Sequence, residues 1–376
     1  MAALHDWLAR QADALDQSDA LASEVLPALA AHGCFRAGVP ASLGGAGNAI
    51  DGTGSGDARA AILAIADVAR HSLTAAFVFW GQRAFIEYLL QSPNAALRER
   101  LLPQLLDGTL AGATGLSNAM KFLSGMEPLQ IRATPAGSLS NNTKSSTLVE
   151  QTGGWTLNGK LAWITNLHPQ RFVAAAAVAP VNGAPPAVVM FDSAAAGVQR
   201  SANLQLIALR GSNTAAVQLE QVAAPAAHII SAQAQQWLPR VRPAFLGMQC
   251  GMAIGLAQAS LDHAAQAAAR GRGQLAADIA AVRTALAAHS AQLLDGVASG
   301  RFVTQAPAMF RLRIGLADLV RQAVTLELHA KGGHAYLEAE QDGFARRLRE
   351  SAFIPVITPS VTQLQAALAQ HAETAP

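Results

Sequence analysis

The sequence predicts an α+β protein, mainly α-helical, with an N-terminal helical domain, a central antiparallel β domain and a C-terminal helical bundle. Two observations predict this order. Apolar residues recur at helical spacing in the first and last thirds of the chain. Between them lie short apolar or alternating runs separated by Gly, Pro and Asn, which are strand and turn signals. We expect domains at 1–115, 116–232 and 233–376.

The composition is that of a globular protein with a large core. Of the 376 residues, 51% are hydrophobic and 14% are charged, so the chain is long enough for two or three domains or layers. A net charge of +2 gives no strong field for a nucleic acid or an acidic membrane. The abundance of Ala with so little charge indicates apolar surface that is buried between subunits.

The cysteines and the N-terminus predict a cytoplasmic protein. Cys34 and Cys250 form no CxxC pair and fit a reducing compartment. The N-terminal stretch "MAALHDWLARQADAL" carries acids and a helical pattern, and has no basic head followed by an apolar run. The most apolar long run, "FLGMQCGMAIGLAQASL", is interrupted by Gln249. We interpret it as a buried helix and expect no membrane span.

The N-terminal helices are expected in "ALASEVLPALAAHG", "DARAAILAIADVARHS", "TAAFVFWGQRAFIEYLLQS" and "NAALRERLLPQLLDG". The Gly-rich piece "LGGAGNAIDGTGSGD" lies between two of them. Because no strand precedes it, we interpret it as a loop and not as a dinucleotide-binding fingerprint.

The strands are expected in "GWTLNGKLAWITNL", "RFVAAAAVAP", "PPAVVMFDS", "VQRSANLQLIAL" and "TAAVQLEQVAAP". No helix intervenes, so an antiparallel sheet is predicted. After the sheet, four long helical patterns run from Arg242 to Phe353. Gly247, Gly251 and Gly255 recur at a spacing of four, which predicts a close helix–helix approach.

These segments resemble the acyl-CoA dehydrogenase family of flavoproteins, in order, over nearly the whole chain. The resemblance is carried by five pieces: "HGCFRAGVPASLGGAG", "LRERLLPQLLDGTLAGATGLSN", "GGWTLNGKLAWITNL", "LIALRGSNTAAVQLEQVAAP" and "HAKGGHAYLEAEQDGFARRLRES". It implies a β-barrel-like central domain, a C-terminal four-helix bundle and assembly as a homodimer or homotetramer. It also implies FAD as cofactor, a small-molecule substrate such as an acyl-CoA, and an electron-transfer flavoprotein as partner.

The resemblance places Trp163, Ile164 and Thr165 against the flavin ring. An indole covers one face of the ring, and a Thr hydroxyl with nearby backbone N–H groups can bind N5 and tune the redox potential. The other interpretation of this stretch is an ordinary strand with Trp163 in the core. Leu116 and Ser117 match a flavin-contacting apolar–hydroxyl pair, although the Glu-Pro that usually follows is Asn118-Ala119 here. The loop "NAMKFLSGMEPLQ" is either a substrate contact or a solvent loop.

Three further cofactor contacts are implied. Gly332 and Gly333 match glycines beside the FAD pyrophosphate, where Gly permits close backbone approach; a helix C-cap is an equally good physical interpretation. Gln363 matches a Glu/Gln near the adenine end. Arg270 matches an Arg that reaches the neighbouring subunit's FAD, with a solvated arginine as the alternative.

The segment "VITPSVTQLQ" matches the place where the resembling enzymes hold a catalytic Glu, the base that removes the α-proton of the acyl thioester. Thr358 or Pro359 stands there, depending on the side from which the match is made. Relatives with the base on the first bundle helix would place it near Phe245. No acid occurs from Gln221 to Leu261. Both base positions are therefore empty, and the segment is predicted to be an active-site wall.

No other chemistry is indicated. The histidines show no zinc-like cluster and no P-loop or GxSxG motif occurs. We interpret "ARRLRE" as a helix paired with Glu350 and Glu340. Three hypotheses remain: a dehydrogenase whose base is another acid, such as Asp262 or Glu338; a two-component monooxygenase that receives reduced FMN or FAD from a flavin reductase; and an inactive flavin- or acyl-CoA-binding protein.

Overall fold

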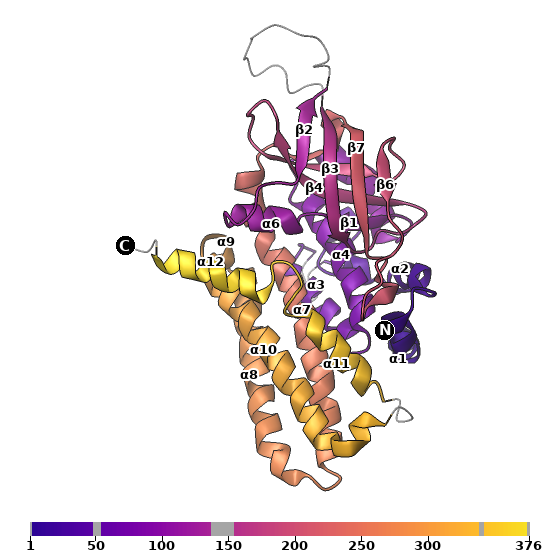
Figure 1. Ribbon diagram of the computed structural model, residues 1–376, viewed down its shortest axis with the longest axis vertical. Helices are drawn as coiled ribbons and strands as arrows, with labels where there is room; N and C mark the ends of the chain where they lie inside the picture. The colour runs from indigo at the N-terminus through magenta and orange to yellow at the C-terminus, as the bar shows by residue number, and fades with distance from the viewer. Residues whose placement is uncertain (1, 48–53, 137–153, 338–341, 374–376) are drawn as a thin grey trace. The chain divides into compact units, whose positions relative to one another are not determined.

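The computed structural model describes residues 2–47, 54–136, 154–337 and 342–373, and Figure 1 shows its ribbon. Helices, a curled central sheet and further helices follow one another along the chain, which confirms the predicted fold class. The chain divides into two compact units. We call them the bundle unit (Met1–Trp80, Gln205–Ser212 and Pro243–Pro376) and the sheet unit (Gly81–Leu204 and Asn213–Arg242). The three domain boundaries stay a prediction.

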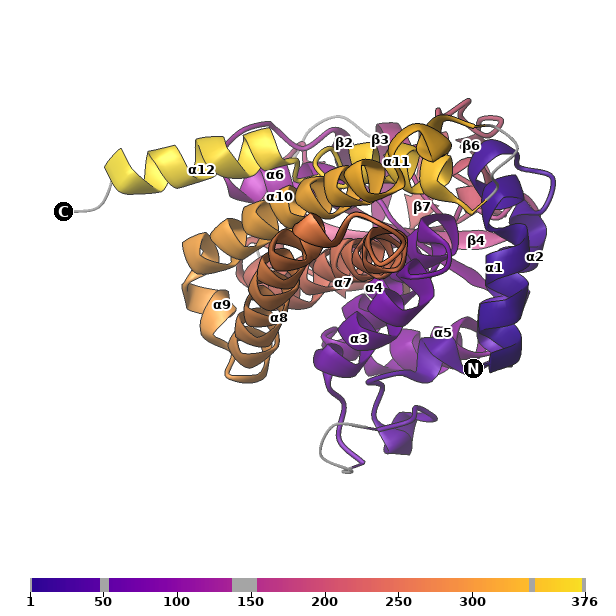
Figure 2. The ribbon, with the colours of Figure 1, turned by 90° about the horizontal axis from the view of Figure 1, so that it is seen from below.

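The first helices of the bundle unit are α1 (Ala2–Gln17), α2 (Ala22–Ala31), α3 (Ala58–Ala69) and the first half of α4 (Leu73–Leu90). α1 is amphipathic, with Leu4, Leu8 and Leu15 buried on one face. α1 lies beside α2 in both ribbon views (Figures 1 and 2). α3 begins at Asp57, whose carboxylate accepts a hydrogen bond from Arg59 N at 2.8 Å.

The later helices of this unit are α7 (Ala234–Ala268, from Pro243 onward), α8 (Ala276–Ala298), α9 (Arg301–Thr304), α10 (Ala306–Lys331), α11 (Phe344–Phe353) and α12 (Val361–Glu373). α8 and α10 run side by side (Figures 1 and 2). The glycines of α7 face α3: a Cβ on Gly251 would lie 2.6 Å from Ile62 O, and one on Gly255 would collide with Ala66 O. The predicted close approach is therefore made by α7 and α3.

α7 is, among the described residues, the one helix with the length and hydropathy of a membrane span. However, 94% of its most apolar window is buried. This burial is the property of a core helix, as the sequence predicts.

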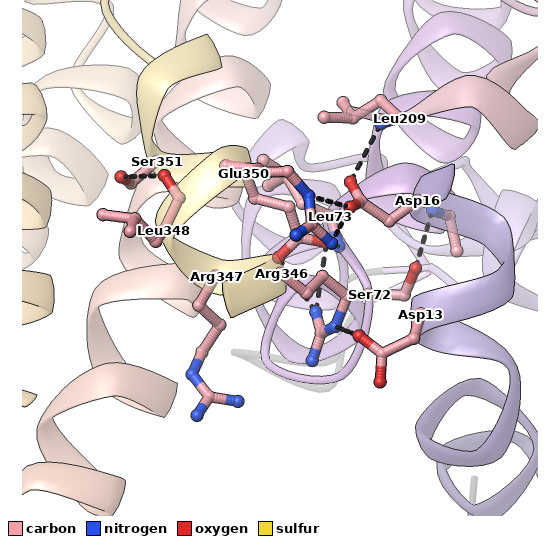
Figure 3. A network of polar contacts seen from close by, with 12 residues as sticks. Asp13, Asp16, Ser72, Leu73, Leu209, Arg346, Arg347, Leu348, Glu350 and Ser351 are labelled. Carbon is pink, nitrogen blue, oxygen red and sulfur yellow. Dashed lines mark hydrogen bonds and ion pairs between the residues drawn. The ribbon is translucent and has the colours of Figure 1, made fainter. Parts of the chain in front are cut away.

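A buried polar network joins α11 to the N-terminal helices (Figure 3). Glu350 is fully buried and accepts hydrogen bonds from Leu73 N at 3.1 Å and from Arg346 Nη1 at 2.9 Å. On α1, Asp16 accepts from Leu209 N at 3.0 Å. Burial raises the pKa of the Glu350 carboxyl, although the Arg346 charge opposes this. The predicted pairing of "ARRLRE" with Glu350 is confirmed, whereas Glu340 lies outside the described residues.

The sheet unit contains eight strands among its described residues, with β6-β7-β3-β2-β4-β5-β8 as the main order and β1 beside β4. They are β1 (Ala111–Thr114), β2 (Ile131–Pro135), β3 (Trp155–Ile164), β4 (Phe172–Pro180), β5 (Ala187–Asp192), β6 (Val198–Arg200), β7 (Ala215–Ala224) and β8 (Ile229–Ser231). Most neighbours are antiparallel, as predicted. β4 is the exception, because it pairs in parallel with β1 and with β2.

One expected strand is much shorter than its sequence pattern. Of "VQRSANLQLIAL", only Val198–Arg200 forms a strand, β6. Residues 205–212 belong to the bundle unit, where the amide of Leu209 is bound by Asp16 instead of a neighbouring strand. The helices of the sheet unit are the second half of α4, α5 (Ala95–Leu106), α6 (Ser117–Leu123) and the start of α7.

Candidate functional site

A β-bulge at the end of β3 turns Trp163 outward. Leu161 pairs with Val217 and Ile164 pairs with Ala215, so β3 has one more residue than β7 over this stretch. A bulge bends the strand and re-aims its side chains. Trp163 is 51% exposed, while Ile164 beside it is 1% exposed. The indole is therefore not a core residue, which was one interpretation of the sequence.

Thr165 and Asn166, which follow the bulge, are buried against α4. A Cβ on Gly81 would lie 3.1 Å from Thr165 Cγ2, so the Thr methyl packs on this helix. Asn166 has a positive φ of 59° and donates through Nδ2 to Gln82 Oε1 and to Gly112 O, both at 2.9 Å. Asn166 Oδ1 is buried and makes no hydrogen bond to the described residues. Sequence reasoning missed this anchor, although Asn166 directly follows the Trp-Ile-Thr motif.

The segment after β1 lies beside β3. Gly115 N donates to Ala175 O at 2.8 Å, and a Cβ on Gly115 would lie 2.8 Å from Leu161 Cδ1. Leu116 is buried and Ser117 is half-buried at the start of α6. The Ser117 hydroxyl makes no hydrogen bond to the described residues. The structure thus brings the Leu116–Ser117 pair and the end of β3 together in one unit.

The loop "NAMKFLSGMEPLQ" is largely ordered by its own contacts. Residues Ser117–Leu123 form α6. Lys121 Nζ binds Glu127 Oε1 at 2.8 Å, and Asn118 Nδ2 donates to Pro128 O at 3.0 Å. These contacts within the loop stabilise its conformation. Its role in substrate binding stays a prediction.

His168 is a titratable group on the same loop as Thr165. Arg200 donates from Nε to Leu167 O at 2.7 Å, which places its guanidinium next to this loop. Burial lowers the pKa of His168, and the Arg200 charge lowers it further. The imidazole is therefore held toward its neutral form.

In the bundle unit, Gly332 and Gly333 border a pocket of about 560 Å³. Its lining residues are Arg272, Gln274, Leu275, Leu328, His329, Gly332, Gly333 and Tyr336. Gly332 is the C-cap of α10, with φ of 58°. This residue therefore both ends the helix and lines the pocket. Tyr336 is 87% exposed. The pocket combines aromatic, amide and cationic groups.

The arginine of this pocket is Arg272 and not Arg270. Arg270 is exposed and does not line the pocket. Arg272 Nη1 donates to Ala330 O at 2.7 Å, and its guanidinium lies where a Cβ on Gly332 would be. No described carboxylate pairs with Arg272. Sequence reasoning missed Arg272 because spacing pointed to the arginine two residues earlier.

The segment predicted to be an active-site wall, "VITPSVTQLQ", contains the turn before α12 and the start of α12. We call residues 353–360, from the end of α11 through that turn, the wall. Ser360 and Gln363 form a capping box at the start of α12: Gln363 N donates to Ser360 Oγ at 3.3 Å, and Ser360 N donates to Gln363 Oε1 at 2.8 Å. Gln363 therefore has a structural role, and its contact with a cofactor stays a prediction. Thr358 is half-buried, and Pro359 is buried.

A buried arginine holds this wall. Arg313 of α10 is 1% exposed. It donates from Nη2 to Ile354 O at 3.3 Å and to Ile357 O at 3.2 Å. It also donates from Nε to Gln249 Oε1 at 3.1 Å, and Gln249 Nε2 donates to Thr358 O at 2.9 Å.

Aromatic packing occupies the other expected base position. Phe245 is fully buried, with its ring 5.1 Å from that of Trp80 and its carbonyl oxygen 3.2 Å from Trp80 Nε1. The candidate replacement acid Asp262 is paired with Arg70 at 2.8 Å and with Arg283 at 2.9 Å. Glu338 lies outside the described residues. In the part of the chain that the structure describes, no group of acids, histidines or cysteines has the geometry of a metal site.

Comparisons with known proteins agree with this architecture. A family model for the N-terminal domain of acyl-CoA dehydrogenase matches residues 2–109. No match is found among curated proteins. Among solved structures, butyryl-CoA dehydrogenase from Megasphaera elsdenii is similar with a TM-score of 0.77 and 17% identity, over 99% of this chain and 94% of that chain.

Two other similar structures are named for different chemistry. KijD3, in complex with FMN and a dTDP-linked amino keto sugar, has a TM-score of 0.75 and 20% identity, over 99% of this chain and 91% of that one. The nitrososynthase from Micromonospora carbonacea var. africana has a TM-score of 0.74 and 20% identity, over 99% and 94%. The family model thus matches the N-terminal helices, and the fold of the whole chain is that of the acyl-CoA dehydrogenase structures.

Proposed function

We propose that the chain is a flavin-dependent oxidoreductase that acts on a small molecule, with an acyl-CoA as the first substrate class to test. The observation that carries this proposal is the bulge in β3. A strand with Trp163 in the core would bury the indole, whereas here the indole is half-exposed beside the buried Ile164. A large exposed aromatic side chain on a rigid strand end is suited to cover a planar ring.

The residues present fit a flavin in both units. In the sheet unit, the Ser117 hydroxyl is available to a ligand, and Trp163 offers its ring face. In the bundle unit, the pocket at Gly332 holds an arginine with no carboxylate partner among the described residues and an exposed Tyr336, which suit a phosphate and an adenine ring. A bound flavin would supply reversible electron transfer to a substrate or to oxygen. The form of the flavin, FAD or FMN, is part of the proposal.

A second candidate is a two-component monooxygenase that uses reduced flavin. It is favoured by the wall, where Thr358 and a buried arginine stand in place of an acid, and by Phe245 at the other base position. Removal of an α-proton needs a base within reach, and none of the described acids is placed at either position. Two similar structures give this candidate further support, since KijD3 is in complex with FMN and the other is a nitrososynthase.

Anaerobic mixing of flavin-loaded protein with a panel of acyl-CoAs tests the proposal. Loss of the oxidised-flavin absorbance with any member of the panel indicates a dehydrogenase whose base lies elsewhere. If flavin binds and no acyl-CoA bleaches it, reduced flavin with oxygen is the next assay, and lack of turnover there indicates a binding protein. If neither FAD nor FMN binds, the proposal is wrong.

A further inference from the structure

A buried positive charge stands next to the wall, residues 353–360. Arg313 is buried to 1% exposure, and its acceptors among the described residues are two backbone carbonyls and one side-chain amide oxygen. All three acceptors are uncharged. Ile354 is the C-cap of α11, so its carbonyl oxygen also carries the partial negative charge of a helix C-terminus. Nε and Nη2 are therefore hydrogen-bonded, while the full charge of the guanidinium is not cancelled.

No described acid compensates Arg313. The ionisable group that interacts with it is the thiol of Cys250, which is fully buried. Burial raises the pKa of Cys250 to about 11 although Arg313 opposes this, so the thiol is neutral near pH 7. Arginine keeps its charge under these conditions even when burial lowers its pKa. A buried and uncompensated positive charge thus lies directly behind the wall.

Thr358 is the residue of the wall that this charge reaches. Arg313 binds the carbonyl of Ile357, the residue immediately before it, and Gln249 binds the carbonyl of Thr358 itself. Thr358 is half-buried, and its hydroxyl makes no hydrogen bond to the described residues. This donor therefore remains available, one residue from a carbonyl that the buried Arg313 binds, and a charge in a place of low dielectric has large electrostatic effects.

We propose that Arg313 gives the Thr358 position a positive electrostatic potential, so that the wall attracts a negatively charged oxygen of a bound molecule, such as a carboxylate or an enolate. Identification of that molecule as the substrate rests on the proposed function. Arg313 and Gln249 act as positioning residues, because Nε and Nη2 of Arg313 and Nε2 of Gln249 donate to acceptors within the protein. A hydroxyl donor beside a positive charge prefers an anionic acceptor over a neutral one.

A cysteine at position 358 measures this potential without a substrate or a flavin. In Thr358→Cys, the thiolate takes the place of the anion, and its pKa follows from the pH dependence of alkylation by iodoacetamide. Cys34 and Cys250 are buried, at 5% and 0% exposure, and react slowly in the folded protein. The reference is the same variant unfolded in urea, whose thiol pKa is about 8.5.

We expect the folded thiol to titrate about one pH unit below the unfolded one, and the difference to persist in 1 M NaCl, because a buried charge is poorly screened. Arg313→Met should remove the difference and Arg313→Lys should keep most of it. A folded pKa at or above the reference overturns the inference, as does a low pKa that disappears in salt. If Arg313→Met does not fold, the pKa of Thr358→Cys in the folded and unfolded protein, with and without 1 M NaCl, still tests the inference. Failure of flavin binding would overturn the proposed function alone.

Discussion

The end of β3 and the wall at 353–360 are built in opposite ways. At the strand end, the aromatic ring of Trp163 is half-exposed, and the side chain of Asn166 three residues later is buried. At the wall, the charge of Arg313 is buried, and Thr358 is a half-buried residue without a charge. The resemblance assigns the first region to a cofactor and the second to a substrate, and no acid stands in the second region. An exposed aromatic ring suits a planar ligand, whereas a buried positive charge suits an anion, so the two regions should respond differently to substitution.

Removal of the Glu350 carboxylate should have the largest effect on the second region, because α11 leads into the wall. Glu350→Ala leaves Arg346 buried without its closest partner and Leu73 N without an acceptor. We expect a loss of about 3–5 kcal/mol in the free energy of unfolding, measured by urea denaturation.

Glu24→Ala on the exposed face of α2 is the matched control and should change stability by less than about 0.5 kcal/mol. Equal effects of the two variants would show that the network in Figure 3 does not support the bundle unit.

Substitution of Trp163 should separate binding from stability at the strand end. Since Trp163 is 51% exposed, Trp163→Ala should leave the free energy of unfolding within about 0.5 kcal/mol. The loss of a stacking ring should weaken flavin binding roughly 10- to 100-fold, as measured by flavin fluorescence titration.

Val181→Ala provides the control, because Val181 is 49% exposed in the same unit and is not a site residue. If Trp163→Ala instead unfolds the sheet unit and leaves flavin affinity unchanged, the indole is a structural residue.

Substitution of Arg272 should have a smaller effect on flavin binding, and substitution of Arg270 should have none. Arg272 borders the pocket at Gly332, whereas Arg270 is exposed two residues before it. Arg272→Gln should weaken FAD binding about tenfold, which corresponds to the loss of one charge-assisted hydrogen bond, and Arg270→Gln should not. Calorimetric titration with FAD and with FMN distinguishes the dinucleotide from the mononucleotide. The same weakening by both variants would indicate a general surface charge effect.

Much of the fold was predictable, because its signals are local. The helix-to-strand-to-helix order follows from the change of period after Gly115. The close approach of α7 follows from Gly251 and Gly255, although the partner helix α3 is nearly two hundred residues away and no spacing points to it. The parallel pairing of β1 with β4 was missed for the same reason, since strand direction depends on non-local contacts.

The candidate site was predictable only where a motif marks it. Trp-Ile-Thr led to Trp163, but a one-residue bulge decides that its ring is exposed, and a bulge has no clear sequence signal. Arg313 was missed entirely. It lies in a helix with ordinary neighbours, and only the folded chain shows that it binds the carbonyls of a turn more than forty residues later. Arg272 was missed because a difference of two positions reverses the direction of a side chain at a helix end.

Protonation of His168 should have the smallest effect on stability. It concerns the end of β3 alone. Residues 353–360 contain no titratable side chain, whereas the loop after β3 contains His168. Burial, followed by the Arg200 charge, lowers the pKa of His168 below the usual value for histidine, about 6.5. The unfolded chain therefore binds more protons at this residue, and its contribution to stability is lost as the pH falls below about 6.5.

The pKa of His168 can be measured by NMR from the shift of its Cε1–H resonance, assigned with His168→Gln. Arg200→Gln should move it upward by a fraction of the full displacement, because burial is the larger cause and remains. Arg200→Lys keeps the charge and is the control for the hydrogen bond to Leu167 O. If Arg200→Gln restores the ordinary pKa completely, burial is not the larger cause, and the loop is more open to water than its burial indicates. The electrostatic potential at the strand end would then be set by a single arginine, as we propose for the wall.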